Sequence, residues 1–128
     1  MSKNIEDKKK LTSSWFQDLQ NQMISSFESL DKKKFQKKTW DRPGGGGGTM
    51  AMMKGEVFEK VGVNISVVHG KFSDEFRKKI PGTENSANFW AAGISIVAHM
   101  KNPKIAAAQF NTRFIATEKS LFGGGCDL

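Results

Sequence analysis

Apolar residues recur at three- and four-residue steps near the start of the chain, which predicts an amphipathic helix. The apolar stripe comprises Trp15, Leu19, Met23, Phe27 and Leu30. Thr12 or Ser13 can cap the start of this helix, and the pattern ends near Asp31. Residues 1–10 are polar and charged, so we expect a flexible basic terminus. A helix with one apolar stripe must bury it, and the face of a sheet is its expected partner.

Strand patterns follow the helix. A short strand is expected within residues 32–43, ended by Pro43 and the glycines at 44–48. Residues 49–70 indicate a strand, a turn at Lys54–Gly55, and a longer strand in which valine and isoleucine alternate with smaller residues. Beyond it the sequence predicts a short helix with the residues DEFRKKI, capped by a serine, and then a loop. The loop residues are Pro81, Gly82, Asn85 and Ser86.

Residues 89–100 and 106–119 are predicted to pair as an antiparallel hairpin across the segment KNPKI. The chain contains no internal repeats and no heptads. The predicted fold class is therefore α+β, with an N-terminal amphipathic helix and an antiparallel, hairpin-rich sheet.

The hairpin places polar side chains together on one face. The expected register sets His99 opposite Gln109, Val97 opposite Asn111, and Ser95 opposite Arg113. The other face carries Trp90, Ile94, Ile96, Phe110 and Phe114. Two interpretations of the polar face stay open. It is either a solvated sheet face or a binding floor, with Arg113 for a carboxylate, Asn111 and Ser95 for hydrogen bonds, and His99 for proton transfer.

Charge and composition narrow the classes of function. The 128 residues include 20 Lys+Arg and 13 Asp+Glu, a net charge of +7, which favours an anionic partner such as a nucleic acid, an acidic membrane surface or a polycarboxylate. No apolar run is long enough to span a bilayer, and the start lacks the apolar stretch of a secretory signal. A single cysteine, Cys126, excludes an internal disulfide, so a reducing cytoplasm is the expected compartment.

Glycine and methionine clusters add little by themselves. The run Gly44–Gly48 is compatible with a linker or with a phosphate cradle, but the Lys-Ser/Thr pair of a P-loop does not follow it. Met50, Met52 and Met53 are expected to fill the core.

Several motifs, taken in order, resemble the oxygen-dependent coproporphyrinogen III oxidases. They are WDRPGGGGG at 40–48, GEVFEKVGVNIS at 55–66, GISIVAH at 93–99, NP at 102–103, NTRF at 111–114 and FGGGCDL at 122–128. The resemblance extends from about Leu11 to the last residue. It implies a large antiparallel sheet flanked by helices, in an enzyme that is usually a homodimer.

The resemblance also implies a reaction. Coproporphyrinogen III and dioxygen give protoporphyrinogen IX, carbon dioxide and hydrogen peroxide, as two propionates are oxidatively decarboxylated to vinyl groups. No organic cofactor is implied, because the electron-rich pyrrole itself reacts with dioxygen. A divalent metal ion is implied only by a histidine that bacterial members assign to it.

The motifs carry site roles onto this chain. Ser95 and the segment Asn111, Thr112 and Arg113 match substrate-binding positions, and His99 matches the metal-assigned histidine. The glycine runs that include Gly44, Gly45, Gly46, Gly123, Gly124 and Gly125 are expected to let the backbone approach a flat macrocycle. Gln109 stands where the family has a proton-donating histidine, and an amide cannot donate a proton at neutral pH.

The family pattern continues beyond Asp127-Leu128 with a second half at least as long. Residues 11–128 are therefore expected to form the N-terminal portion of the oxidase domain. One interpretation is that the chain is an oxidase segment that acts with a separately encoded C-terminal half. Another is that it is a catalytically inactive remnant of the enzyme. A third, from another class, is a small basic module that binds nucleic acid or a membrane surface.

Overall fold

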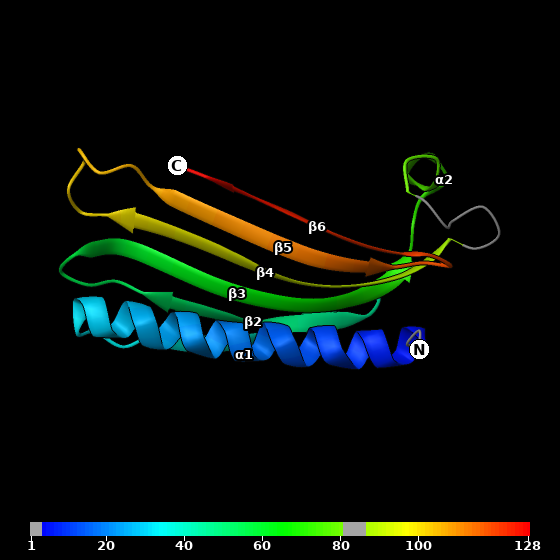
Figure 1. Cartoon of the computed structure of the whole chain (residues 1–128), viewed down its shortest axis with the longest axis horizontal. Coiled ribbons are helices and arrows are strands. Elements are labelled where there is room, and N and C mark those ends of the chain that lie inside the picture. Colours follow the sequence, from blue (N-terminus) through cyan, green and yellow to red (C-terminus); the bar gives the residue numbers. More distant parts are fainter. Residues whose placement is uncertain (1–3, 81–86) are drawn as a thin grey trace.

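A computed structural model describes residues 4–80 and 87–128. It contains one long helix and a six-stranded sheet, which confirms the predicted α+β class (Figure 1). In chain order the elements are α1 (Ile5–Asp31), β1 (Gln36–Asp41), β2 (Gly46–Met53), β3 (Phe58–Lys71), α2 (Asp74–Arg77), β4 (Asn88–Met100), β5 (Ala108–Ala116) and β6 (Ser120–Asp127). The predicted loop at Pro81, Gly82, Asn85 and Ser86 lies outside the described residues.

The sheet is antiparallel throughout, and its strands lie side by side in sequence order from β1 to β6. α1 runs along one side of this sheet (Figure 1) and packs against β3, β4 and β5. The helix and the sheet thus form two layers, and their shared interface is the core.

The helix begins earlier than the sequence predicts. It starts at Ile5, so the expected flexible terminus over residues 1–10 is wrong for its helical part. Asn4 caps the helix, because its side-chain oxygen accepts a hydrogen bond from the Asp7 N–H at 2.8 Å. Thr12 lies inside the helix, where its hydroxyl donates to the Lys8 carbonyl at 2.9 Å.

The buried face of α1 differs from the predicted stripe. The buried residues are Phe16, Gln20, Ile24 and Asp31, while Leu19, Met23 and Phe27 pack at the edge of the core. Trp15 is 51% exposed and Leu30 is 64% exposed, so both ends of the predicted stripe face outward. Hydrogen bonding explains the difference: the Gln20 amide donates to the carbonyls of Thr49 at 3.1 Å and Val63 at 3.0 Å.

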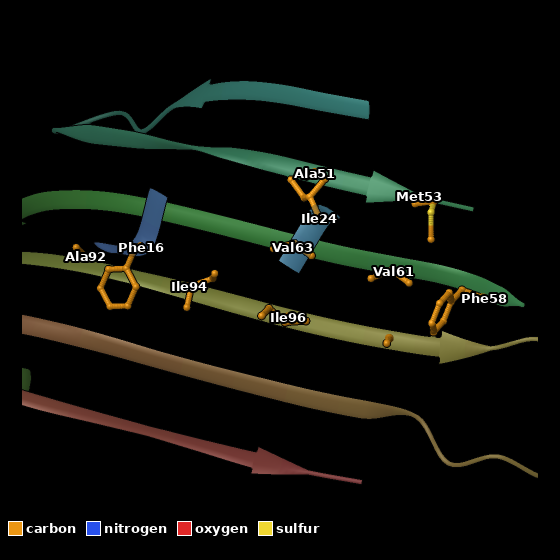
Figure 2. Close-up of a cluster of buried hydrophobic side chains, with 11 residues drawn as sticks. Phe16, Ile24, Ala51, Met53, Phe58, Val61, Val63, Ala92, Ile94 and Ile96 are labelled. Atoms are coloured by element: carbon orange, nitrogen blue, oxygen red, sulfur yellow. The ribbon is translucent and has the colours of Figure 1, made fainter. Parts of the chain in front are cut away.

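The core is formed by apolar side chains from three strands, β2, β3 and β4, and by one aromatic and one branched side chain from α1. Figure 2 shows Phe16 and Ile24 of α1 over the strands. The buried cluster comprises Phe16, Ile24, Ala51, Met53, Phe58, Val61, Val63, Ala92, Ile94, Ile96 and Ala98. Met53 fills the core as predicted, but Met50 (44% exposed) and Met52 (42%) lie on the other face of β2, because side chains alternate along a strand.

The end of α1 is tied to the sheet by one carboxylate. Asp31 accepts hydrogen bonds from the backbone N–H groups of Glu56 at 2.7 Å, Val57 at 3.1 Å and Phe58 at 2.9 Å. Burial alone raises the pKa of Asp31, but these three bonds and the charge of Lys101 outweigh that effect and hold the pKa below its ordinary value. A Cβ at Gly55 would collide with this carboxylate, so the turn requires glycine there.

The glycine-rich segments are strands to a larger extent than predicted. β2 already begins at Gly46, and the terminal FGGGCD segment forms the edge strand β6, which the sequence pattern did not indicate. Gly44, Gly45 and Gly46 make the β1–β2 turn with φ of 98°, 140° and 88°. Only glycine adopts this backbone without strain.

Candidate functional site

The face of the sheet opposite α1, here called the open face, carries the polar side chains that the sequence singled out. The hairpin register differs from the predicted one: Ser95 pairs with Asn111, and Gly93 pairs with Arg113. Val97, and not His99, lies opposite Gln109. The shift moves each partner by two residues, so every side chain stays on its predicted face. Ser95, Asn111 and Arg113 therefore do lie together.

A hollow of about 520 Å³ lies at the centre of the open face. Its lining residues are Trp40, Met50, Asn64, Ile65, Ser66, Val68, Ala91, Ala92, Gly93, Ile94, Ser95, Asn111, Thr112 and Arg113. Asn64 pairs with Ser95 across β3 and β4, so amide and hydroxyl groups from three adjacent strands form one row with Asn111. Trp40 and Met50 supply apolar surface beside this row.

Of these lining residues, the site predicted from sequence names only Ser95, Asn111, Thr112 and Arg113, and it misses polar and apolar residues from β1, β2 and β3. Asn64 and Ser66 occupy the polar positions of the alternating β3 pattern, and this alternation was the signal that could have placed them on the open face. Trp40 and Met50 come from β1 and β2, and no local pattern links those strands to the β4–β5 hairpin. Only the sheet order brings them to the hollow.

Arg113 is the one cation in the lining of the hollow. Its partners on both neighbouring strands are glycines, Gly93 on β4 and Gly123 on β6. No side chain therefore stands beside it across either strand pair. Arg113 is exposed, and among the described residues it forms no ion pair. Its guanidinium is free to bind an external carboxylate in a bidentate manner.

The two glycine runs are placed differently. Gly123 and Gly125 lie on the open face opposite Arg113 and Asn111, and a Cβ at either would meet nothing within 4 Å. Packing does not require glycine at these two positions, but glycine leaves no side chain above β6 beside Arg113 and Asn111. Gly124 points to the other face, where a Cβ would collide with the Asn111 carbonyl oxygen. The glycines at 44–46 do not line the hollow, and their φ angles give them a role in the turn.

Thr112 and Gln109 also depart from a simple site. Thr112 pairs with the buried Ile94 on the helix-covered face, and its hydroxyl donates to the Gly123 carbonyl at 3.2 Å. The Thr112 hydroxyl thus holds β6 against β5. Thr112 borders the hollow, but its side chain belongs to the face that α1 covers. Gln109 is exposed on the open face between Val97 and Asp127. Its amide does not titrate, so it cannot transfer a proton.

His99 lies apart from the hollow, in a pocket of about 450 Å³ that it shares with Lys54, Glu59 and Lys60. Within residues 4–80 and 87–128, no three His, Cys, Asp or Glu side chains are grouped so that they could hold a metal ion. The pocket offers a cation one imidazole and the one carboxylate of Glu59, and its two ammonium groups repel a divalent cation. The side chains that this chain places at His99 therefore do not by themselves fit a metal ion.

Neither helix in the described part of the chain is long and apolar enough to cross a membrane.

Comparison with known proteins supplies the remaining evidence. The family model described as coproporphyrinogen III oxidase matches residues 11–128. Oxygen-dependent coproporphyrinogen-III oxidase of Rickettsia africae (strain ESF-5) is 53% identical over 135 residues, which cover 98% of this chain and 48% of the relative. The enzymes of the same name from Rickettsia felis (strain ATCC VR-1525 / URRWXCal2) and Rickettsia bellii (strain OSU 85-389) are both 52% identical, over 95% and 94% of this chain. The chain spans about half the length of these relatives.

Proposed function

Because the chain belongs to the coproporphyrinogen III oxidase family, we propose that its open face binds coproporphyrinogen III for oxidative decarboxylation. In that reaction each of two propionates, R–CH2–CH2–COOH, reacts with one dioxygen to give a vinyl group R–CH=CH2, carbon dioxide and hydrogen peroxide. The propionate side chain loses two electrons, with its electron-rich pyrrole assisting their removal, and dioxygen accepts them, so no organic cofactor is required. The product is protoporphyrinogen IX.

The observation that carries this proposal is the position of Arg113 on the floor of the hollow between two glycines. A carboxylate that approaches the open face meets this guanidinium without a neighbouring side chain in the way. Ser95, Asn111 and Asn64 offer hydrogen bonds beside it, and Trp40 offers apolar surface to a flat ring. A net charge of +7 favours the approach of a tetracarboxylate.

The residues of this chain bind and orient the substrate, and they do not supply its proton transfer. Gln109 occupies the position of the family's proton donor and cannot act as one. The chain also spans about half the length of its relatives, so we assign to it substrate binding and not the complete reaction. Dimerisation, a separately supplied C-terminal half and a cytoplasmic location are proposed on family membership alone.

Substrate binding can be tested with coproporphyrin III, a stable oxidised surrogate, by fluorescence titration. A bidentate guanidinium–carboxylate contact is worth about 1.5–3 kcal/mol, so Arg113→Ala should weaken binding about tenfold or more. Arg77→Ala, which removes the same charge from α2, is the matched control and should leave the affinity unchanged. Equal affinities for Arg113→Ala and the unaltered chain would remove Arg113 from the site.

A second candidate function, porphyrinogen binding without catalysis, is favoured by Gln109. Loss of one positioned acid–base group costs about 10²–10⁴-fold in rate. We expect no enzyme-dependent protoporphyrin from the chain alone, and none from Gln109→His alone. Gln109→His should raise the rate only when a C-terminal half is co-expressed. The assay measures protoporphyrin fluorescence in air. Protoporphyrin formed by the unaltered chain would contradict the proposal that it binds without catalysis.

A further inference from the structure

A second basic pocket lies on the same open face as the hollow. It is lined by Lys54 after β2, Glu59 and Lys60 of β3, and His99 of β4. Lys60 and His99 are direct partners across the β3–β4 pair. The register shifts between Phe58 and Lys60, so Glu59 is the extra residue of an irregularity in the strand.

The pocket and the hollow lie along the same two strands, β3 and β4. Ser95, in the hollow, and His99, in the pocket, are four residues apart on β4, which corresponds to about 13 Å along a strand. Between them Val97 pairs with Gly62, which has no side chain. Met52 of β2 is the other partner of Gly62, so a flat ligand that extends from the hollow to the pocket passes over the apolar side chains of Met52 and Val97.

The charges of this pocket favour an anion. Lys54, Lys60 and His99 are all exposed, and Glu59 is the only carboxylate in the lining. In the part of the chain that the structure describes, neither lysine forms an ion pair. Two unpaired ammonium groups on one wall bind a carboxylate by charge-assisted hydrogen bonds.

We propose that the pocket of Lys54, Lys60 and His99 binds a second carboxylate of the tetracarboxylate macrocycle, and not a divalent cation. The proposal rests on the proposed function, because it assumes that the macrocycle lies over the hollow with one carboxylate on Arg113. The two basic sites then recognise carboxylates at opposite sides of the ring, and they discriminate a tetracarboxylate from a dicarboxylate.

The test compares two porphyrins that differ in carboxylate number, coproporphyrin III with four and mesoporphyrin IX with two. The double variant Lys54→Met/Lys60→Met should weaken coproporphyrin III binding about tenfold at low ionic strength. Its effect on mesoporphyrin IX should stay below about twofold, since that ring is held at Arg113. The matched control, Lys10→Met/Lys33→Met, removes the same charge from exposed positions on and after α1 and should change neither affinity.

The outcomes are distinguishable. Unchanged coproporphyrin III affinity in Lys54→Met/Lys60→Met, together with a loss in Arg113→Ala, overturns this inference and leaves the proposed function standing. Stoichiometric Mn²⁺ binding, detected by electron paramagnetic resonance and abolished by His99→Ala, also overturns it. If the unaltered chain binds neither porphyrin, the proposed function is wrong and this inference falls with it.

Discussion

Replacing Gln20 with leucine should destabilise the fold, although leucine is the residue that a hydrophobicity pattern favours at a buried helical position. Gln20 has no exposed surface, and its amide bridges two strands by donating to the carbonyls of Thr49 and Val63. Leucine has a similar size but no donor. Both carbonyls would then lose this partner, and the Val63 carbonyl would lose it in a buried position.

The magnitude follows from the number of bonds. Each net hydrogen bond contributes about 0.5–1.5 kcal/mol, so two bonds contribute about 1–3 kcal/mol. The leucine side chain recovers part of this by burying apolar surface, at about 25 cal/mol per Å². We expect a net loss of about 1–2 kcal/mol in the free energy of unfolding.

Urea unfolding, followed by circular dichroism, measures this loss. Gln22→Leu is the matched control, because Gln22 is exposed on the same helix and its replacement should change stability by less than about 0.5 kcal/mol. Gln20→Glu adds a pH readout. Its buried carboxyl must stay protonated to donate, so this variant should become less stable as the pH rises. A Gln20→Leu protein as stable as the unaltered chain would refute the reasoning.

Three further predictions concern positions where one atom decides the outcome. Hydrogen bonds to the ionised form lower the pKa of Asp31, so the stabilisation that this carboxylate gives should be complete above the ordinary value of 3.8 and be lost as the pH falls through the lower folded-state pKa. Asp31→Asn should therefore be less stable than the unaltered chain at pH 7, and the difference should disappear in acid. Thermal unfolding across a range of pH measures it. Gly46→Ala should destabilise by about 2 kcal/mol or more in urea, because φ is 88° and the new Cβ would collide with the Val67 carbonyl oxygen. Gly123→Val should keep the stability within about 0.5 kcal/mol yet weaken coproporphyrin III binding, whereas Gly124→Val should lower the stability; equal stabilities would contradict the assignment of these glycines to opposite faces.

The sequence predicts most of the fold because side-chain alternation is a local property. The alternation of Val61, Val63, Ile65 and Val67 identifies β3 and its buried face without knowledge of any partner. The features that the sequence does not predict depend on partners that are distant in sequence. Gln20 is buried only because Thr49 and Val63 present carbonyls to it. β6 is a strand only because β5 pairs with it, since glycine has low strand propensity.

The candidate site is predictable to a similar degree. Ser95, Asn111 and Arg113 share a face in every register that differs from the predicted one by an even number of residues. The register itself is set by the loop between β4 and β5, whose conformation the sequence pattern does not specify. The pattern therefore predicts His99 opposite Gln109, whereas in the structure Val97 lies opposite Gln109.

The sequence-ordered sheet has a consequence for synthesis on the ribosome. Each strand can pair with its predecessor as soon as both have emerged, so the sheet can grow by successive pairing of strands that are neighbours in sequence. α1 is made before the strands that cover it, because its partners extend to β5 and the Phe16 ring lies 6.1 Å from the ring of Phe122 in β6. Phe16 is therefore not fully covered until nearly all of the 128 residues have been translated. During that interval this helix is the segment that a chaperone would protect.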